Sequence, residues 1–428
     1  MNKTLKPGWS YKKLNELGFV GRGKSKHRPR NEPSLYGGKH PFIQTAEVTA
    51  SEFYIIKYSQ TYSDLGLAQS KLWDKNTLCI VNAGENTAET AILKFQACFP
   101  DSIIGFIADS EKADVRFIKY YLTTIKPQLR SITKGATQDN LSVSKLLLFD
   151  ILTPPLPIQR KIAGILSAYD DLIENNTRRI EILEEMARSI YREWFVKFRF
   201  PGHEQVQMVD SELGLIPEGW EVKNLGNLTS VITKGTTPTT LGQKYTSEGI
   251  NFIKVESIDS SGSILDNKLA KIDKETHILL KRSQLNTGDI LFSIAGAIGR
   301  STIISENVLP ANTNQALAII RPIEPLLVLY LYRVIQSREF VNFSLGRVVQ
   351  TAQANVSLSV LSAAPILVPD KLTLEKFRDI SQPIVKAVDL VQQKNLNLRQ
   401  TRDLLLPRLI SGEMDVENLD INTGEIAA

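Results

Sequence analysis

Two long stretches of the chain carry apolar residues at alternating steps of three and four positions. The first runs from Gln159 to about Phe198 without a proline, and the second from about Thr373 to Ile410. This spacing is typical of an apolar stripe along a helix and, sustained over several heptads, of a coiled coil. A helix of 40 residues is roughly 60 Å long, which is more than one small domain covers. We therefore expect each helix to need a partner.

The seam positions of these two helices follow from the heptad spacing. In the first helix they are Ile162, Leu166, Tyr169, Ile173, Asn176, Ile180, Leu183, Ala187, Ile190 and Trp194. In the second helix they are Phe377, Ile380, Ile384, Ala387, Val391, Asn395, Leu398 and Leu405. Pro383 predicts a kink or a restart after the first turn, and Gly412 predicts the end of the helix.

The simplest packing of the two helices is an antiparallel pair within the chain. Two separate core helices, or association with another chain, are the alternatives. Asn176 and Asn395 occupy seam positions, where a polar residue fixes the register of two helices. They are equally compatible with tolerated polar gaps.

The segments before the helices match each other at a nearly constant offset of about 210 to 215 residues. GWSYKKLNEL (8–17) matches GWEVKNLGNL (219–228), and HPFIQTAEVTAS (40–51) matches INFIKVESIDSS (250–261). TQDNLS (137–142) matches AQANVSLS (352–359). Each copy has short β-branched and aromatic runs punctuated by Gly, Asn, Ser and Pro, and a long helix follows it. The chain is therefore one module duplicated, and we expect two globular α/β (α+β) domains joined by two long antiparallel helices, with a pseudo-twofold repeat.

Composition excludes several classes of protein. The 428 residues are 42% hydrophobic and 23% charged, as in ordinary globular domains. No run of about 18 apolar residues predicts a membrane helix, and the first residues do not resemble a secretory signal. The two cysteines, Cys79 and Cys98, cannot cross-link a chain of this length through disulfides, so we expect reduced thiols and a cytoplasmic protein.

Positive charge is concentrated in the first third of the chain. Residues 1–153 carry 21 Lys and Arg against 14 Asp and Glu, which gives +7, whereas the whole chain has a net charge of +5. Much of it lies in GRGKSKHRPRNEPSLYGG (21–38), which its glycines and prolines predict to be a loop. The basic positions there are Arg22, Lys24, Lys26, His27, Arg28 and Arg30. Such a loop suits DNA phosphates and guanine edges, although a solvated basic loop is the simpler interpretation.

The sequence contains one apparent catalytic motif, a phosphate-loop pattern, and its surroundings argue against it. Gly18–Ser25 satisfies the phosphate-loop pattern G-x-x-x-x-G-K-[ST]. The residues before it are not an apolar strand, and Pro29 and Pro33 forbid a helix after it, so we do not expect a nucleotide site. We find no H-E-x-x-H, C-x-x-C or G-x-S-x-G, and the four histidines lack metal-ligand spacing. The chain is expected to catalyse nothing alone.

These residues resemble the specificity subunits of type I restriction-modification enzymes. Residues 154–202 resemble the central spacer of that family, and DSELGLIPEGWEVKNLG (210–226) resembles the start of its second recognition domain. Residues 398–416 resemble the end of the distal spacer helix. PFIQTAEV and GINFIKVESI resemble the strand after the first variable loop of each domain. The resemblance covers essentially the whole chain.

The resemblance implies target-recognition domains over 1–153 and 203–371, spacer helices over 154–202 and 372–415, and a tail over 416–428. In the family each domain reads one half of a split, asymmetric sequence in double-stranded DNA, and the helices set the gap. Two modification (methyltransferase) subunits and two restriction (motor-nuclease) subunits join the chain, and S-adenosylmethionine, ATP and Mg²⁺ are expected on those partners, not here.

Repeat alignment then adds candidate DNA contacts beyond the basic loop. In the second domain these are Lys234, Thr236, Thr237, Thr239 and Thr240. A later pair of matching loops adds Lys134, Gln138, Asn140, Arg347, Gln350, Gln353 and Asn355. Asn and Gln suit adenine edges, but capping or strand-end hydrogen bonds explain them equally well.

Three other functions remain open at this point. One is a specificity module within a type IIB or type IIG-like enzyme. Another is a coiled-coil adaptor with no role on DNA, which the basic loop argues against. The third is a P-loop ATPase, which the residues around Gly18–Ser25 argue against.

Overall fold

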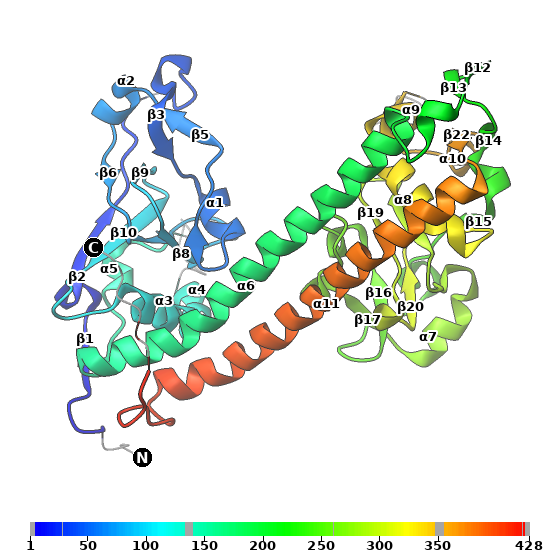
Figure 1. Ribbon diagram of the computed structural model, residues 1–428. Helices are drawn as coiled ribbons and strands as arrows, with labels where there is room; N and C mark the ends of the chain where they lie inside the picture. The colour runs from blue at the N-terminus through cyan, green and yellow to red at the C-terminus, as the bar shows by residue number, and fades with distance from the viewer. Residues whose placement is uncertain are drawn as a thin grey trace. The chain divides into compact units, whose positions relative to one another are not determined.

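The computed structural model describes residues 5–27, 29–132, 140–259, 261–346, 355–421 and 423. The chain forms two compact units, Met1–Thr177 with Gln393–Ala428 and Arg178–Gln392. Two long helices, α6 (Leu156–Tyr191) and α11 (Lys371–Ile410), each contribute one part to each unit (Figure 1). We call the first of the two compact units unit 1 and the second, Arg178–Gln392, unit 2.

Unit 1 is built on a five-stranded sheet in the order β2-β10-β7-β8-β4. The strands are β2 (Gly18–Arg22), β10 (Ile103–Ala108), β7 (Leu78–Val81), β8 (Thr90–Leu93) and β4 (Tyr54–Ile55). β7 and β8 are buried at every position, as their continuous apolar sequences predict. A second sheet holds β5 (Gln60–Tyr62), β3 (Tyr36–Phe42), β9 (Ala97–Cys98) and β6 (Leu72–Trp73), and β1 (Ser10–Lys12) pairs with β11 (Ile151–Thr153). The shorter helices are α1 (Thr45–Ala50), α2 (Asp64–Ala68), α3 (Val115–Thr124), α4 (Lys126–Ser131) and α5 (Val143–Leu146).

Unit 2 has a four-stranded sheet in the order β15-β21-β18-β19. Its strands are β15 (Thr229–Lys234), β21 (Leu317–Pro322), β18 (Ile290–Ser293) and β19 (Ser301–Ile303). Smaller sheets hold β17 (Ala270–Ile272), β16 (Ile250–Ile253) and β20 (Ala311–Thr313); β14 (Glu221–Asn224) and β22 (Pro365–Val368); and β12 (Met208–Ser211) and β13 (Gly214–Pro217). The shorter helices are α7 (Lys274–Leu279), α8 (Val328–Gln336), α9 (Arg338–Leu345) and α10 (Leu358–Ser362).

The sequence repeat has a counterpart in the strand pairing of each unit. The order β2-β10-β7-β8 in unit 1 corresponds to β15-β21-β18-β19 in unit 2. β3 pairs in parallel with β9, as β16 does with β20. Isolated bridges join Ala83 to Asn140 in unit 1 and Ala295 to Asn355 in unit 2. Two segments of one chain therefore adopt the same topology.

Both long helices contribute to the core of each unit. In unit 1, Leu166 of α6 and Leu409 of α11 belong to the same buried cluster as the sheet residues Ile80 and Phe106. In unit 2, Phe377 of α11 packs with Trp194 and Phe195, which follow α6 in a short π-helical turn, Arg192–Val196. The two helices thus contribute side chains to the hydrophobic cores of both units.

The predicted seam is buried in part. The positions that are buried are Ile162, Leu166, Ile173, Ala187, Trp194, Phe377, Val391 and Asn395. Those that are half-buried are Tyr169, Asn176, Ile180, Leu183, Ile190, Ile384, Ala387, Leu398 and Leu405. Ile380 is exposed, and the neighbouring Ser381 takes the buried position, because the stripe of a straight helix drifts away from a strict heptad.

Within unit 1, α6 and α11 meet at the two predicted polar seam residues. The Asn176 amide donates to the Asn395 side-chain oxygen at 2.8 Å, and Asn395 also lies 3.4 Å from the carbonyl oxygen of Ile173. The side-chain bond satisfies polar groups that burial would otherwise leave unpaired. Asn176 and Asn395 are therefore partners and not unrelated gaps.

Pro383 does not restart the second helix, contrary to the sequence prediction. α11 is continuous from Lys371 to Ile410. Pro383 is exposed, as is Asp379 one turn earlier, so the carbonyl that loses its hydrogen-bond donor lies on a solvated face. The predicted stop is confirmed, because Gly412 has a φ of +71° and follows the end of the helix.

A buried ion pair links the two helices in unit 1. Arg402 of α11 pairs with Asp170 of α6, and the Tyr120 hydroxyl of α3 donates to the same carboxylate. The Asp170 side chain is 3% exposed and that of Arg402 18%. Residues of α6, α11 and α3 therefore meet at one carboxylate. These contacts explain why Asp170 is buried, although its neighbour Tyr169 was the predicted seam residue.

We predict that Arg402→Met lowers the free energy of unfolding by about 3 kcal/mol, because it leaves a buried carboxylate without its cation. Arg408→Met on the same helix is the matched control, since Arg408 and Glu413 are both more than half exposed and such pairs contribute ~1 kcal/mol or less. Urea unfolding of both variants measures the difference. Equal losses would contradict the role given to Asp170.

Lys119 of α3 is buried, and burial lowers its pKa to about 8, although the Asp170 charge opposes the shift. Its ammonium lies over the Phe53 ring, 4.7 Å from the centroid. Because an unfolded lysine titrates near pH ~10.4, the unfolded state binds more protons between the two pKa values. The stability contributed by this site therefore rises with pH across that window.

We predict that the free energy of unfolding of the wild type, relative to Lys119→Met, increases by up to about 3 kcal/mol between about pH 7 and about pH 10. Denaturant unfolding at a series of pH values gives this difference directly. Subtracting the variant removes the titration of every other group. A difference that does not change with pH would show that folding does not lower the pKa of Lys119.

Candidate nucleic-acid interface

The predicted basic residues of unit 1 follow the end of an edge strand. β2 ends at Arg22, at the edge of the sheet where β10 begins and β7 ends, since Arg22 pairs with Ile104 and Val81 with Ile103. The predicted loop over 21–38 is shorter than expected, because Gly21 and Arg22 belong to β2 and Tyr36 opens β3. The loop thus spans residues 23–35 and includes a short turn, Pro33–Leu35.

Backbone contacts hold the start of this loop against the sheet. The Gly23 amide donates to the Ile103 carbonyl at 2.8 Å, and the Lys24 amide donates to the Phe99 carbonyl at 3.0 Å. A Cβ at Gly23 would lie 2.2 Å from the Pro100 carbonyl oxygen, so only glycine fits. The phosphate-loop pattern therefore has another origin: its first residues form a strand, and its second glycine permits close packing.

Two arginines of the loop converge on Asp101. Arg22 donates through Nε and Nη2 to the Asp101 carbonyl at 3.1 and 2.8 Å, and Arg30 pairs with the Asp101 carboxylate at 2.8 Å. The Asn82 amide donates to the same carbonyl at 2.8 Å. Arg22 and Arg30 lie eight residues apart in the sequence, and both bind Asp101: Arg22 binds its carbonyl and Arg30 its carboxylate.

The second predicted loop of unit 1 returns to this edge. Asn140 bridges Ala83, and the Leu141 amide donates to the Asn82 carbonyl at 2.8 Å. The backbone of Asn140 therefore lies beside the end of β7, and the role of its side chain stays a prediction. Of the other predicted residues, Lys26, His27 and Arg30 are exposed and Lys24 is half-buried. Arg28, Lys134 and Gln138 lie outside the described residues.

Unit 2 builds the same edge with different side chains. β15 ends at Lys234; the Gly235 amide donates to the Leu317 carbonyl at 3.3 Å, and the Thr236 amide donates to the Thr313 carbonyl at 3.1 Å. A Cβ at Gly235 would lie 2.0 Å from the Thr313 oxygen. Gly23 and Gly235 therefore make the same close approach in the two units.

The hydroxyls after this glycine are partly engaged. Thr237 donates to the Gln315 side chain, and the Thr240 hydroxyl donates to the Thr237 carbonyl at 2.7 Å. Thr239 and Thr240 are exposed in a short 3₁₀ turn, Pro238–Leu241. Asn355 bridges Ala295 at the same edge, as Asn140 does in unit 1. The predicted residues Arg347, Gln350 and Gln353 lie outside the described residues.

Sequence reasoning missed several residues that the fold brings to these edges. Asp101 and Gln69 contact the first loop of unit 1, and Arg282 and Gln315 contact that of unit 2. All four are distant in sequence from the loop they touch. The repeat carried one signal for them, because QSKL (69–72) matches RSQL (282–285) at the offset of the other blocks.

Lys71 lies two residues after Gln69 and contacts two aromatic rings. Its ammonium lies 3.7 Å from the centroid of the Trp73 ring and 4.3 Å from that of Phe19. Burial lowers the pKa of Lys71. Phe19 is exposed on β2, so a cation and an aromatic face lie beside the loop.

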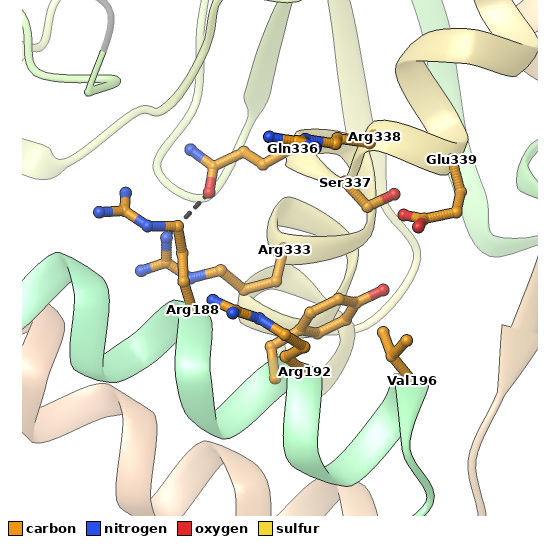
Figure 2. Close-up of a pocket in the computed structure, with 9 residues that line it drawn as sticks. Arg188, Arg192, Val196, Arg333, Gln336, Ser337, Arg338 and Glu339 are labelled. Carbon is orange, nitrogen blue, oxygen red and sulfur yellow. Dashed lines mark hydrogen bonds between the residues drawn. The ribbon is translucent and has the colours of Figure 1, made fainter.

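A recess of about 520 Å³ in unit 2 carries four arginines (Figure 2). They are Arg188, Arg192, Arg333 and Arg338. Glu184 pairs with Arg333 at 2.9 Å, and Glu185 pairs with Arg188 and Arg192 at 3.0 and 3.1 Å. The two carboxylates of α6 thus balance about half of this charge, and the Glu184–Arg333 pair links α8 to α6. We assign the recess a structural role.

The described residues offer neither a metal-ion cluster nor a membrane-spanning helix. No group of three or more His, Cys, Asp or Glu side chains is arranged to hold a metal ion in the described ranges. None of the helices in the described part of the chain is both long and apolar enough to cross a membrane.

Comparison with known proteins assigns the chain to a family. The family model for the type I restriction modification DNA specificity domain matches residues 6–185 and again residues 217–400, so both copies of the repeat are recognised. The chain therefore belongs to the family of type I restriction-modification specificity proteins, which confirms the resemblance seen in the sequence.

Named relatives match over nearly the whole chain. The MjaIX specificity subunit of Methanocaldococcus jannaschii is 26% identical over 432 residues, covering 96% of this chain and 94% of the relative. The EcoBI specificity subunit of Escherichia coli is 24% identical, covering 80% and 74%. The crystal structure of the S subunit from M. genitalium has the same fold, with a TM-score of 0.53, 15% identity and coverage of 95% and 98%.

We predict that Gly23→Ala destabilises the chain by about 1 to 3 kcal/mol, because its Cβ would meet main-chain atoms that have no room to shift. Gly346→Ala is the control: its φ is not in the left-handed region, and among the described residues the atom nearest to the Cβ would be the Asn342 oxygen, at 3.2 Å. Thermal or urea unfolding compares the two. An unaffected Gly23→Ala variant would disprove the close approach.

Proposed function

We propose that the chain is the DNA-specificity subunit of a type I restriction-modification complex, and that each copy of the repeat reads one half of a split, asymmetric target. The observation that carries this proposal is the repeated sheet edge. In both units a glycine anchors a loop to the same strand positions, while the residues after it differ. A constant support with variable side chains suits the reading of two different half-sites.

The side chains at the two edges favour DNA as the ligand. Unit 1 offers exposed Lys26 and Arg30 beside Arg22, and arginine reads guanine bidentately or binds phosphate. Unit 2 offers Lys234, exposed threonine hydroxyls and Arg282. We propose that these residues, together with the Asn140 and Asn355 loops, contact the target. The dissimilar loops imply dissimilar half-sites.

The long helices are proposed to be the spacer that sets the gap between half-sites. α11 has 40 residues, which corresponds to about 60 Å of helix, and one turn of DNA is about 34 Å. Two reading modules on one rigid connection bind their half-sites with an effective concentration that the geometry sets. The Asn176–Asn395 contact would then fix the helix register and with it the length of the gap.

The catalytic steps are assigned to partner proteins. We propose that two modification subunits methylate adenine with S-adenosylmethionine, and that two restriction subunits use ATP and Mg²⁺ for translocation and cleavage. The chain itself would supply recognition and a scaffold. A specificity module in a type IIB or type IIG-like enzyme is the alternative, and the genes beside this one decide between them.

The test is a methylome. We predict that coexpression with the neighbouring modification subunit creates a split motif with methyladenine in both halves, which is absent from cells that lack this chain. Single-molecule sequencing of genomic DNA detects it. If both proteins fold and associate but no new methylation appears, the role in specificity is refuted and an adaptor without a DNA role becomes the better account.

A further inference from the structure

A short segment supports the first loop of each unit, and it occupies the same place in the repeat. In unit 1 it is Gln69–Ser70, just before Leu72 pairs with Cys98. In unit 2 it is Arg282–Ser283, just before Gln284 bridges Asn312. Both serines are buried, whereas the residues before them reach the loop. We call these two pairs the support segments.

In unit 1 the support segment forms hydrogen bonds with main-chain atoms of the loop. The Gln69 side-chain oxygen accepts from the amides of Lys26 and His27 at 2.5 and 3.0 Å. The Ser70 hydroxyl donates to the Lys24 carbonyl at 2.7 Å. Three bonds therefore fix the path of residues 24–27 whatever side chains the loop carries.

Gln69 bonds to the loop through its side-chain oxygen and not through its side-chain nitrogen. Its Nε2 is buried and has no hydrogen-bond partner among the described residues. An unpaired buried N–H costs about 1 to 3 kcal/mol, so the two bonds to the oxygen must outweigh it. The hydrogen bonds to the loop therefore explain why a glutamine occupies this position, since its buried nitrogen gains no partner.

In unit 2 the support segment contacts a side chain and leaves donors available. Arg282 Nη2 donates to the Thr236 hydroxyl at 3.1 Å, and the Arg282 side chain is otherwise exposed. Its other N–H groups make no hydrogen bond within the described part of the chain. A guanidinium fixed through one nitrogen can donate its remaining N–H groups to a base edge or a phosphate.

We propose that the support segments determine half-site specificity, an inference that rests on the proposed function. Gln69 is a positioning residue, which acts through the main chain of Lys26 and His27. Arg282 is a DNA-contact residue, which reads the second half-site together with Thr236. Base discrimination requires side chains held to within ~0.5 Å, so a loosened loop loses preference before it loses all binding.

The experiment compares base preference in the two halves of the target. The complete complex with its modification subunits methylates a panel of duplexes that each carry one changed base pair. We expect Gln69→Met to reduce discrimination about tenfold in one half and to leave the other half unchanged. Arg282→Met should reduce it by a similar factor in the opposite half. The unaffected half reports that each variant is folded and assembled.

Matched controls separate positioning from packing. Gln69→Glu keeps the acceptor oxygen and should keep the relative base preference, even if the added charge weakens overall binding. Lys281→Met changes an exposed cation beside Arg282 and should leave the preference intact. Arg282 is exposed, so its variant carries no folding risk and decides the second half of the proposal alone.

Two results would overturn the inference. One is an equal loss in both halves, which indicates a general defect. The other is an unchanged preference in both variants. Either would leave the proposed function standing, provided that the wild-type complex recognises a split motif. A wild type that recognises none would refute the proposed function itself.

Discussion

The close approach of two glycines to the neighbouring backbone is the constraint on which the candidate interface depends. Gly23 and Gly235 each donate a main-chain hydrogen bond to the first part of β10 or β21, and at both positions a Cβ would overlap a carbonyl oxygen. The loop that follows is therefore attached at one fixed point, whatever its own sequence. This attachment lets the fold stay the same while the side chains beyond it vary.

The two edges differ in the chemistry that they present. Unit 1 combines several cations with Asp101, which orients Arg22 and Arg30 and partly offsets their charge. Unit 2 presents hydroxyls and a single arginine on its support segment. Part of the charge excess of the first third of the chain thus lies at the edge of unit 1. A pair of identical half-sites would not require this difference.

Much of the architecture was predictable from local pattern, because it rests on periodicity. The heptad stripes identified α6 and α11, and the constant offset identified two modules. The contact between Asn176 and Asn395 was one of two interpretations that the sequence left open, because both are polar residues in an apolar stripe. Strand limits were less accurate, since Gly21, Arg22 and Tyr36 pair with distant strands that no local pattern reveals.

The residues that sequence reasoning missed act over long separations. Asp170 is buried because Arg402, 232 positions away, neutralises it, and a heptad count favours its apolar neighbour Tyr169. Gln69 and Arg282 contact loops 42 to 46 positions away, and neither lies in a cluster of like residues. Only the fold places such side chains.

The most direct test is to replace the second recognition segment, residues 203–371, by a second copy of residues 1–153. If each copy of the module reads one half-site, coexpression with the modification subunit should produce methylation at a symmetric motif, in which the first half-site occurs twice in inverted orientation. Sequencing of the methylated genome identifies the motif. Persistence of the original asymmetric motif in this chimera would contradict the assignment of one half-site to each module.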